Sequence, residues 1–366
     1  MILGAGINGC AIARRFSQAG KRVLVIERRA VGSGTSSNSS KLIHGGLRYL
    51  ETGRFGLVRE SLRERGRLVR LYPDLVRMVP FFLPVYGDSP RPWWVIRVGL
   101  GVYDLFTGFG EYSCRGVAKQ SFLEGFAGIR GAGLTRVYRY YDAKTDDLEL
   151  TRRIAEDAVN SGCAIREGCE VREVDFGGSS IGIRAVDGNG EYEFETGLLI
   201  NATGPWIDEV NDRYALPHDH RIAKVSGIHI VIDRLLVPDC MFLQTSGRRI
   251  FYMIPWRDEQ TIIGTTERME VKRCDEVAVD EEDIEYLLRC ASGYLKEPLR
   301  REDVCSTFLG IRPLIREKGK SDATGMSREY KIEVHGDRGC RLVNVYGGKL
   351  TTALSLAEKV YKQVYR

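Results

Sequence analysis

Residues 1–27 read MILGAGINGCAIARRFSQAGKRVLVIE, and their pattern of apolar residues and glycines predicts the type of fold. It opens with the apolar residues 1–3 and closes with a second apolar run at residues 22–27. Between these runs lie a glycine-rich turn at residues 4–9 and a segment whose apolar side chains recur at helical spacing. This order predicts a strand, a turn, a helix and a second, parallel strand.

The glycines and one acid in this stretch have the positions that a nucleotide site requires. Gly4 permits a tight turn, Gly6 lets the backbone approach a pyrophosphate, and Gly9 lets the helix pack closely on the sheet. The helix N-terminus faces the phosphates, and Glu27 at the end of the second strand can accept hydrogen bonds from ribose hydroxyls. We therefore predict dinucleotide binding, with NAD and FAD both open; the alternative is a glycine-rich turn with a solvated Glu27.

The next segment favours FAD over NAD. Residues 33–51 read SGTSSNSSKLIHGGLRYLE, which is rich in small hydroxyl side chains and ends near a Gly-Gly pair. Backbone and hydroxyl donors of this kind can wrap an extended cofactor, whereas an NAD enzyme would continue with alternating strands and helices. The alternative for this segment is a flexible surface loop.

Composition and charge narrow the class of protein. The chain has 366 residues, is 43% hydrophobic and 28% charged, and has a formal net charge of +5, which indicates a two-domain globular protein and excludes disorder and coiled coil. The modest positive charge suits an anionic substrate or membrane surface and does not indicate nucleic acid. The nine cysteines form no CxxC pair, so we expect reduced thiols in a cytoplasmic protein without a metal site. No run of about twenty apolar residues predicts a membrane span.

Several motifs resemble one flavoprotein family. The string at residues 35–51, together with NATGPW at 201–206, IGTT at 263–266, GIRPL at 310–314, SREY at 327–330 and GGKLTT at 347–352, is similar to FAD-dependent glycerol-3-phosphate dehydrogenases of the D-amino-acid-oxidase-like group. The resemblance covers essentially the whole chain. It implies noncovalent FAD and oxidation of sn-glycerol 3-phosphate to dihydroxyacetone phosphate, with hydride transfer from C2 to flavin N5. Members of that family usually continue with a helical domain after the last motif, whereas this sequence ends at Arg366.

The predicted fold class is α/β: an FAD-binding Rossmann-like domain of glutathione-reductase type with a mixed-sheet substrate (cap) domain. A helix is expected over residues 147–161, followed by short strands around 170–171, 181–186 and 192–196 with a hairpin turn at residues 187–190. A strand at 198–202 is expected to end beside the nucleotide. Between about residues 222 and 330 we expect alternating strands and one helix that starts at Asp280 and carries Ile284, Leu287, Leu288 and Leu295 on one face. We assign residues 1–75, 145–221 and 331–366 to a discontinuous FAD-binding domain. Residues 76–144 and 222–330 are assigned to the cap domain.

The residues and the resemblance together predict the cofactor site. The expected cofactor-binding residues are Gly4, Gly6, Ile7, Asn8, Gly9, Glu27, Arg28, Thr35, Ser36, Ser37, Ser40, Lys41, Leu42, Ile43, His44, Gly45, Gly46, Val171, Ala202, Thr203, Gly204, Trp206, Gly310, Gly348, Lys349, Leu350, Thr351 and Thr352.

Binding a phosphate dianion requires several converging cations. Arg48, Arg312, Arg328 and Lys349 lie in the matched motifs and are the candidates, with Tyr49 as a further hydroxyl donor. Guanidinium groups bind phosphate oxygens in bidentate fashion. The alternative is that each is a solvated surface charge, and that Tyr49 is a packed core side chain.

The proton acceptor remains open between two histidines. His44 adjoins the Gly-Gly turn, and His229 begins an alternating strand that would face the cleft. Arg312 or Lys349 with a lowered pKa, or a water molecule, are the alternatives. Ser226 stands where the family often has a lysine before Gly-x-His.

The electron acceptor and the partners are also open. Residues 91–106 are apolar and aromatic, with paired tryptophans, and predict either a core helix or a helix lying in a membrane interface. The resemblance implies quinone as acceptor and a peripheral position on the inner face of the cytoplasmic membrane; relatives that reduce oxygen are the alternative. A homodimer is a further expectation. The rival functions are an amine or 2-hydroxy-acid flavin oxidoreductase and a non-catalytic FAD-binding subunit.

Overall fold

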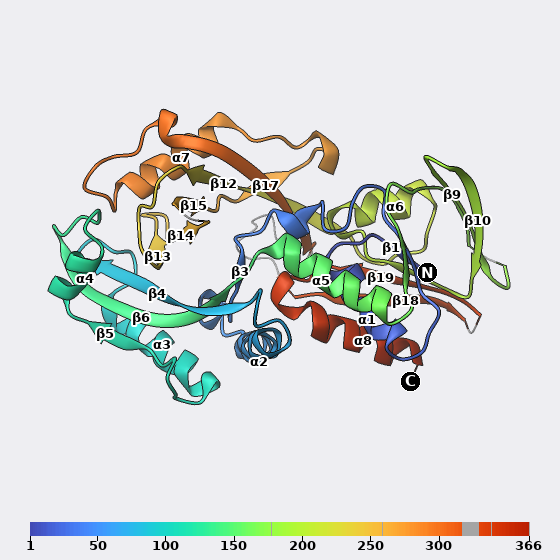
Figure 1. Cartoon of the computed structure of the whole chain (residues 1–366), viewed down its shortest axis with the longest axis horizontal. Helices are drawn as coiled ribbons and strands as arrows, with labels where there is room; N and C mark the ends of the chain where they lie inside the picture. The colour runs from blue at the N-terminus through green and yellow to red at the C-terminus, as the bar shows by residue number, and fades with distance from the viewer. Residues whose placement is uncertain (177, 258, 317–328, 338, 366) are drawn as a thin grey trace.

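Three β-sheets organise the computed structural model, which describes residues 1–366 apart from 177, 258, 317–328, 338 and 366. Figure 1 shows the largest sheet in one half of the molecule and the two smaller sheets in the other, with both chain termini in the second half. Within the described residues, no helix combines the length and apolar character that crossing a bilayer requires.

A six-stranded sheet carries the predicted nucleotide motif. Its order is β18 (Lys331–Asp337), β19 (Cys340–Tyr346), β11 (Leu198–Asn201), β1 (Ile2–Leu3), β2 (Leu24–Ile26) and β7 (Ala164–Arg166). All neighbours are parallel except β18 and β19. The strands β1, β2 and β11 read as continuous apolar runs because helices cover the sheet. The predicted parallel pairing of the first two strands is confirmed.

Three helices pack on this sheet around a shared core. They are α1 (Ile7–Ser17), α5 (Asp147–Asn160) and α8 (Ala353–Tyr365). The side chain of Asp146 caps α5 by accepting from the amides of Leu148 and Glu149, which fixes the start of the helix where the apolar periodicity predicts it. A short helix, α6 (Ile207–Arg213), follows β11.

A three-stranded antiparallel sheet lies at the far end of this half (Figure 1). Its strands are β8 (Glu170–Asp175), β9 (Ile181–Asp187) and β10 (Gly190–Thr196), in the order β10-β9-β8. The predicted hairpin between β9 and β10 is confirmed.

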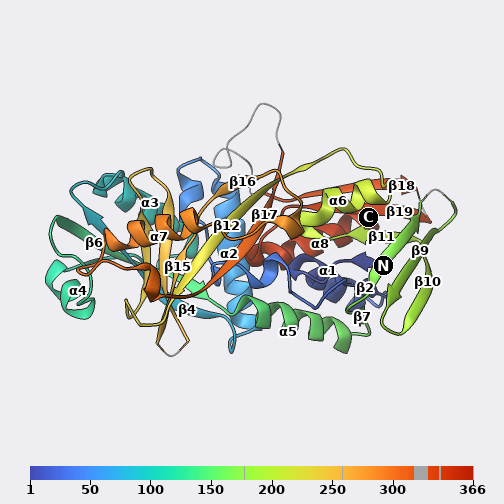
Figure 2. The same ribbon diagram turned by 90° about the horizontal axis from the view of Figure 1, so that it is seen from above.

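The ten-stranded mixed sheet forms the other half. Its main path is β16 (Arg268–Glu270), β12 (Ile222–Ile232), β15 (Gln260–Gly264), β14 (Ile250–Trp256), β13 (Cys240–Gln244), β4 (Arg77–Tyr86), β6 (Leu134–Lys144) and β3 (Leu42–Ile43), with β17 (Val304–Ile315) pairing β12 and β5 (Arg115–Val117) pairing β6. This half contains the helices α3 (Trp93–Thr107), α4 (Lys119–Gly125) and α7 (Glu281–Ser292). The helix α2 (Phe55–Leu71) lies beside the six-stranded sheet. Figure 2 shows β12 and β17 side by side, running toward the six-stranded sheet.

Two details differ from the expectations. Leu295, expected on the apolar face of the helix after Asp280, lies beyond the end of α7 at Ser292; it is buried beside Ile129 instead. β3, inside the segment assigned to the FAD-binding domain, pairs with β6 of the large sheet. The chain therefore passes from the six-stranded sheet to the ten-stranded sheet at β3, beside the site described next.

Candidate active site

A cavity of about 880 Å³ lies where the six-stranded sheet meets β12 and β17. Its volume is at the upper end of the range for ligand pockets. The N-terminus of α1, the carboxyl ends of β1 and β11, and the segment after Gly347 all contribute to its lining. Open α/β sheets bind ligands at this edge.

The glycine turn packs so tightly against the start of α1 that there is no room for a side chain at Gly9. A Cβ on Gly9 would lie 2.0 Å from the carbonyl oxygen of Gly4, so only glycine lets α1 approach the turn. Gly4 has φ +93°, in the region that L side chains rarely adopt. The hydroxyl of Ser36 accepts from the Ile7 amide at 2.9 Å, which joins the residues 33–51 to the first turn of α1.

The carboxylate of Glu27 stands at the cavity edge as the nucleotide motif predicts. Its Oε2 accepts from the Ala5 amide at 2.8 Å, and Oε1 accepts from the Arg29 amide at 2.9 Å. These bonds orient the side chain, which lines the cavity after β2. A dinucleotide ribose fits beside such an acceptor.

The serine-rich segment is held against β17 and α5. Thr35 donates through its hydroxyl to the Ile311 carbonyl at 2.7 Å, and a Cβ on Gly310 would lie 2.4 Å from the Asn38 carbonyl oxygen. Asn8 donates to the Gly347 carbonyl at 3.1 Å and ties the last motif to α1. These contacts form a continuous cradle of backbone and hydroxyl groups, so the residues present fit an extended FAD.

Asp275, from the large-sheet half, contacts three side chains that line the cavity. Asp275 accepts from Arg28 at 2.7 Å, from Arg29 at 3.1 Å and from the indole nitrogen of Trp206 at 3.2 Å. Arg28 also lies over the Trp206 ring, 4.8 Å from its centroid. The pKa of Asp275 lies below its ordinary value, because the Arg28 and Arg29 contacts outweigh the opposing effect of burial.

Three of the four predicted cations lie in or beside the cavity. Arg312 lines it and donates to the Thr265 hydroxyl at 2.9 Å. Arg48 and Arg312 each lie 3.8 Å from the same carboxylate oxygen of Glu267, whose side chain is 9% exposed. The two guanidinium groups are therefore neighbours, although the residues are far apart in the sequence.

Lys349 has contacts different from those of the two arginines. Its Nζ donates to the Ser61 hydroxyl at 2.9 Å and lies 4.6 Å from the centroid of the Tyr49 ring. Lys349, Tyr49 and Arg312 all line the cavity. Arg328 lies outside the described residues.

His229 is fixed in the cavity wall. It is 2% exposed, its Nε2 lies 2.8 Å from the Ser40 hydroxyl, and its ring stacks on Phe308 with centroids 4.6 Å apart. Burial lowers the pKa of His229 to about 3, with Arg312 and Lys41 as further causes. The imidazole is therefore neutral near pH 7, and its Nδ1 is buried without a hydrogen-bond partner among the described residues.

We expect the buried neutral His229 to make the protein less stable in mild acid. Because the folded pKa is about 3 and the unfolded value is near 6.5, the unfolded chain binds more protons between these values. The free energy of unfolding should therefore fall by up to about 1.4 kcal/mol per pH unit as the pH drops through this window. Denaturant titrations at pH 7 and 5.5 should show a loss about 1 kcal/mol larger for the wild type than for His229→Gln. Equal losses would contradict a depressed pKa.

Most predicted residues line the cavity. They are Gly4, Gly6, Ile7, Asn8, Glu27, Arg28, Thr35, Ser36, Ser40, Leu42, His44, Tyr49, Val171, Ala202, Thr203, Gly204, Trp206, His229, Gly310, Arg312, Gly348, Lys349, Leu350 and Thr351. The others with described positions are not among the residues that line the cavity: Gly9, Ser37, Lys41, Ile43, Gly45, Gly46, Arg48 and Thr352. Among these, Lys41 forms a buried ion pair with Asp147, which the sequence analysis missed.

Other contributors were also missed. Glu267 and Asp275 hold the cations described above, Phe308 stacks on His229, and Tyr214 lines the cavity and donates to the Val171 carbonyl at 2.5 Å. Glu267 directly follows the IGTT motif, so its position in the sequence was an available signal. Asp275 and Tyr214 lie in segments without such a motif.

Comparisons with known proteins show the family to which the chain belongs. The family model described as FAD dependent oxidoreductase (DAO) matches residues 1–360. The chain is 34% identical over 363 residues to D-erythritol 1-phosphate dehydrogenase of Brucella abortus, covering 98% of this chain and 72% of that protein. It is also 34% identical over 376 residues to aerobic glycerol-3-phosphate dehydrogenase of Escherichia coli, covering 100% of this chain and 72% of that protein.

Solved structures show the same fold. A glycerol-3-phosphate dehydrogenase from Bacillus halodurans complexed with FAD superimposes with a TM-score of 0.78 at 24% identity, covering 99% of this chain and 63% of that one. An L-alpha-glycerophosphate oxidase from Mycoplasma pneumoniae with FAD bound gives 0.77 at 16% identity, covering 100% of this chain and 94% of that one. With a nucleotide cradle, a cavity and a family match over nearly its whole length, the chain belongs to the DAO family of FAD-dependent oxidoreductases.

Proposed function

We propose that this FAD-dependent oxidoreductase oxidises sn-glycerol 3-phosphate to dihydroxyacetone phosphate. The observation that carries the proposal is the convergence of Arg312 and Lys349 on the same cavity as the nucleotide cradle, with Arg48 beside Arg312. An amine or 2-hydroxy acid would need one carboxylate-binding arginine and not a group of cations. The names of the relatives from Escherichia coli and Brucella abortus, both phosphorylated-polyol dehydrogenases, support a phosphorylated substrate.

Arg312 binds the phosphate in this proposal. Thr265 holds its guanidinium on one side and Glu267 on the other, so the fork has a fixed orientation before the substrate arrives. Charge-assisted hydrogen bonds of this kind are about twice as strong as neutral ones, and a fixed fork loses little entropy on binding. Lys349 supplies a second positive charge near the reacting carbon.

The substrate hydroxyl proton passes to His229 or His44, both of which line the cavity. FAD held in the nucleotide cradle would supply the hydride acceptor for the hydrogen on C2. His229 starts neutral, and a bound phosphate would offset the Arg312 charge that helps to lower its pKa, so that the imidazole becomes a better proton acceptor. Loss of one hydride and one proton from C2–H and O–H leaves the C2 carbonyl of the product.

Replacement of Lys349 by methionine should weaken substrate binding and lower the flavin reduction potential together. The Lys349 charge stands at the start of the last helical segment, where the flavin pyrimidine edge is expected and where reduction places negative charge. We expect about tenfold weaker substrate affinity and a potential lower by roughly 30 mV, which is tenfold for a two-electron couple. Anaerobic substrate titration and redox-dye equilibration would measure the two effects. Lys362→Met, an exposed change on α8, is the control; unchanged potential and affinity in Lys349→Met would contradict the role.

Electrons pass to quinone in this proposal, with the α3 face as the peripheral membrane contact. Trp93 and Trp94 are 48% and 58% exposed at the start of α3, and Val98 and Leu105 are exposed further along it. Tryptophans with adjoining apolar side chains are suited to the headgroup region of a bilayer. Oxygen as acceptor is the competing possibility, and a homodimer stays a prediction.

Anaerobic reduction of the bound flavin tests the proposed function. Purified protein should have a flavin spectrum that sn-glycerol 3-phosphate bleaches, whereas glycerol and glycine leave it unchanged. D-erythritol 1-phosphate belongs in the same panel because of the relative in Brucella abortus. Bleaching by an amine alone would contradict the proposal and indicate an amine oxidoreductase. A flavin spectrum that no substrate changes would favour a non-catalytic FAD-binding subunit.

A further inference from the structure

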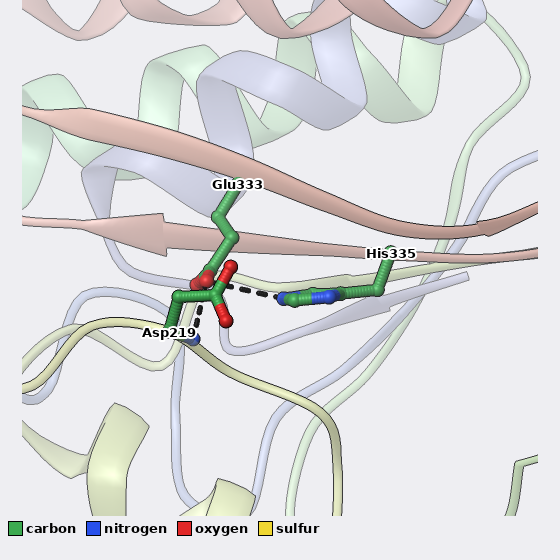
Figure 3. A group of neighbouring side chains, drawn as sticks. All are labelled: Asp219, Glu333 and His335. Atoms are coloured by element: carbon green, nitrogen blue, oxygen red, sulfur yellow. Dashed lines mark hydrogen bonds and ion pairs between the residues drawn. The ribbon is translucent and has the colours of Figure 1, made fainter.

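A cluster of donor side chains lies outside the cavity, at the edge of the six-stranded sheet. Asp219 lies in the loop between α6 and β12, and Glu333 and His335 lie on the edge strand β18. Glu333 and His335 are two residues apart, so their side chains leave the strand on the same face. Figure 3 shows the three side chains converging from the loop and the strand.

The donor atoms are close enough to share one ion. One oxygen from each carboxylate and one nitrogen of His335 all lie within 4.8 Å of one another. Donors bound to one ion at about 2.0–2.2 Å lie roughly 3–4 Å apart, so the side chains must rotate toward one another when the ion binds. None of the three residues is among the described residues that line the cavity, so the cluster is separate from the proposed catalytic site.

Contacts to one oxygen orient the Glu333 carboxylate, as is usual for carboxylates that bind a metal. The residue is 7% exposed; its Oε1 accepts from the Asp219 amide and lies 3.4 Å from Nδ1 of His220. Its Oε2 is buried and has no hydrogen-bond partner of good geometry among the described residues, although the Tyr346 hydroxyl also interacts with this carboxylate. Ligating carboxylates are commonly fixed by such outer hydrogen bonds on one oxygen, which leave a lone pair of the other oxygen for the ion.

An ordinary ion pair accounts for only part of this arrangement. His335 Nε2 lies 3.1 Å from Glu333 Oε1, at ion-pair distance without hydrogen-bond geometry. A protonated His335 would balance Glu333, which leaves the Asp219 carboxylate without a counterion within this group of three residues. The nearby Lys331 ammonium contacts Nε2 of His220, 2.5 Å away, on the opposite side of that ring from Glu333. A divalent cation would balance both carboxylates and use a neutral His335.

We propose that Asp219, Glu333 and His335 bind one divalent transition-metal ion, with one imidazole nitrogen, two carboxylate oxygens and water as ligands. A mixed nitrogen and oxygen set favours zinc, cobalt or nickel over calcium and magnesium, which prefer oxygen alone. The ion would join the loop that leads into β12 to the edge strand β18. Since a ligand that binds only the folded state stabilises it, the ion should raise the melting temperature.

Cobalt binding to the chelator-treated holoprotein tests the site. Calorimetric titration should give one Co²⁺ per chain, with an increase in melting temperature, and X-ray absorption should show nitrogen and oxygen neighbours at about 2.0–2.2 Å. Asp219→Asn and His335→Gln should each weaken binding at least tenfold, because loss of a ligand exceeds the 10- to 100-fold typical of outer-shell changes. Asp219 is exposed, so its amide variant keeps the fold.

His218→Gln is the matched control, since His218 lies in the same loop with its Nδ1 2.8 Å from the Leu216 carbonyl and is not one of the three donors. Its affinity should stay within about twofold of wild type. Equal affinity in Asp219→Asn and wild type would overturn the proposal by showing that other surface groups bind the ion. Absence of binding at millimolar Co²⁺ would also overturn it and leave an ion pair. Flavin bleaching is not used as a readout, so failure here is distinct from failure of the proposed function.

Discussion

Arg312→Ala is expected to reduce kcat/KM for sn-glycerol 3-phosphate by about 100- to 1000-fold while FAD stays bound. The guanidinium can donate two charge-assisted hydrogen bonds to phosphate, each worth about 1.5–3 kcal/mol, and the alanine side chain supplies neither. The nucleotide cradle is built from other residues, so the yellow colour should persist. Steady-state kinetics and the flavin-to-protein ratio measure the two quantities.

Two further variants locate the effect. Arg312→Lys keeps the charge but loses the fork, so an intermediate loss is expected if orientation matters. Arg300→Ala removes an exposed guanidinium outside the cavity lining and should leave kcat/KM unchanged. Loss of FAD in Arg312→Ala, or kinetics equal to those of Arg300→Ala, would show that the cation does not bind substrate.

The nucleotide half was predictable because its physical requirements are local in the sequence. The close approach of Gly9 to Gly4 and the acid after β2 fall within one continuous stretch. Apolar periodicity placed α5, and the turn residues placed the β9–β10 hairpin. Each of these signals needs only neighbouring residues.

The strands of residues 76–144 lacked such a signal. β4 contains Pro80 and Pro84, which argue against a strand inside a sheet because proline donates no ladder hydrogen bond. The structure accommodates them because the β13 pairing is confined to Phe81 and Phe82. Pro80 and Pro84 pair with residues of β6, and neither is one of the two β4 residues that pair with β13.

The candidate site was predictable in its cations but not in their partners. Arg312 and Lys349 stood in recognisable motifs, whereas Ser61 meets Lys349 across 288 residues of sequence. The burial that lowers the pKa of His229 likewise depends on packing between distant strands. Whether a polar side chain faces the cofactor or supports another side chain is decided by that packing, as Lys41 shows.

Lys41→Met is expected to destabilise the protein by about 3–5 kcal/mol, because it leaves the fully buried Asp147 carboxylate without its cation. Lys41 is 8% exposed, and its Nζ also donates to the Ser37 carbonyl at 2.7 Å. Asp147 further accepts from the amide and hydroxyl of Ser39, so the pair fixes the serine-rich segment onto α5. Burial raises the pKa of Asp147 despite these contacts, so loss of the lysine should raise it further.

Denaturant unfolding of the FAD-free protein distinguishes this structural role from direct cofactor binding. If Lys41 acted only on FAD, the apoprotein would be as stable as wild type, which would contradict the ion-pair role. The double variant Lys41→Met with Asp147→Leu should recover much of the loss, because two apolar side chains leave no unpaired buried charge. Arg152→Met breaks an exposed pair with Glu149 on the same helix and should cost less than about 1 kcal/mol. All three variants remove an ion pair, so the differences between their losses of stability depend on how deeply each pair is buried.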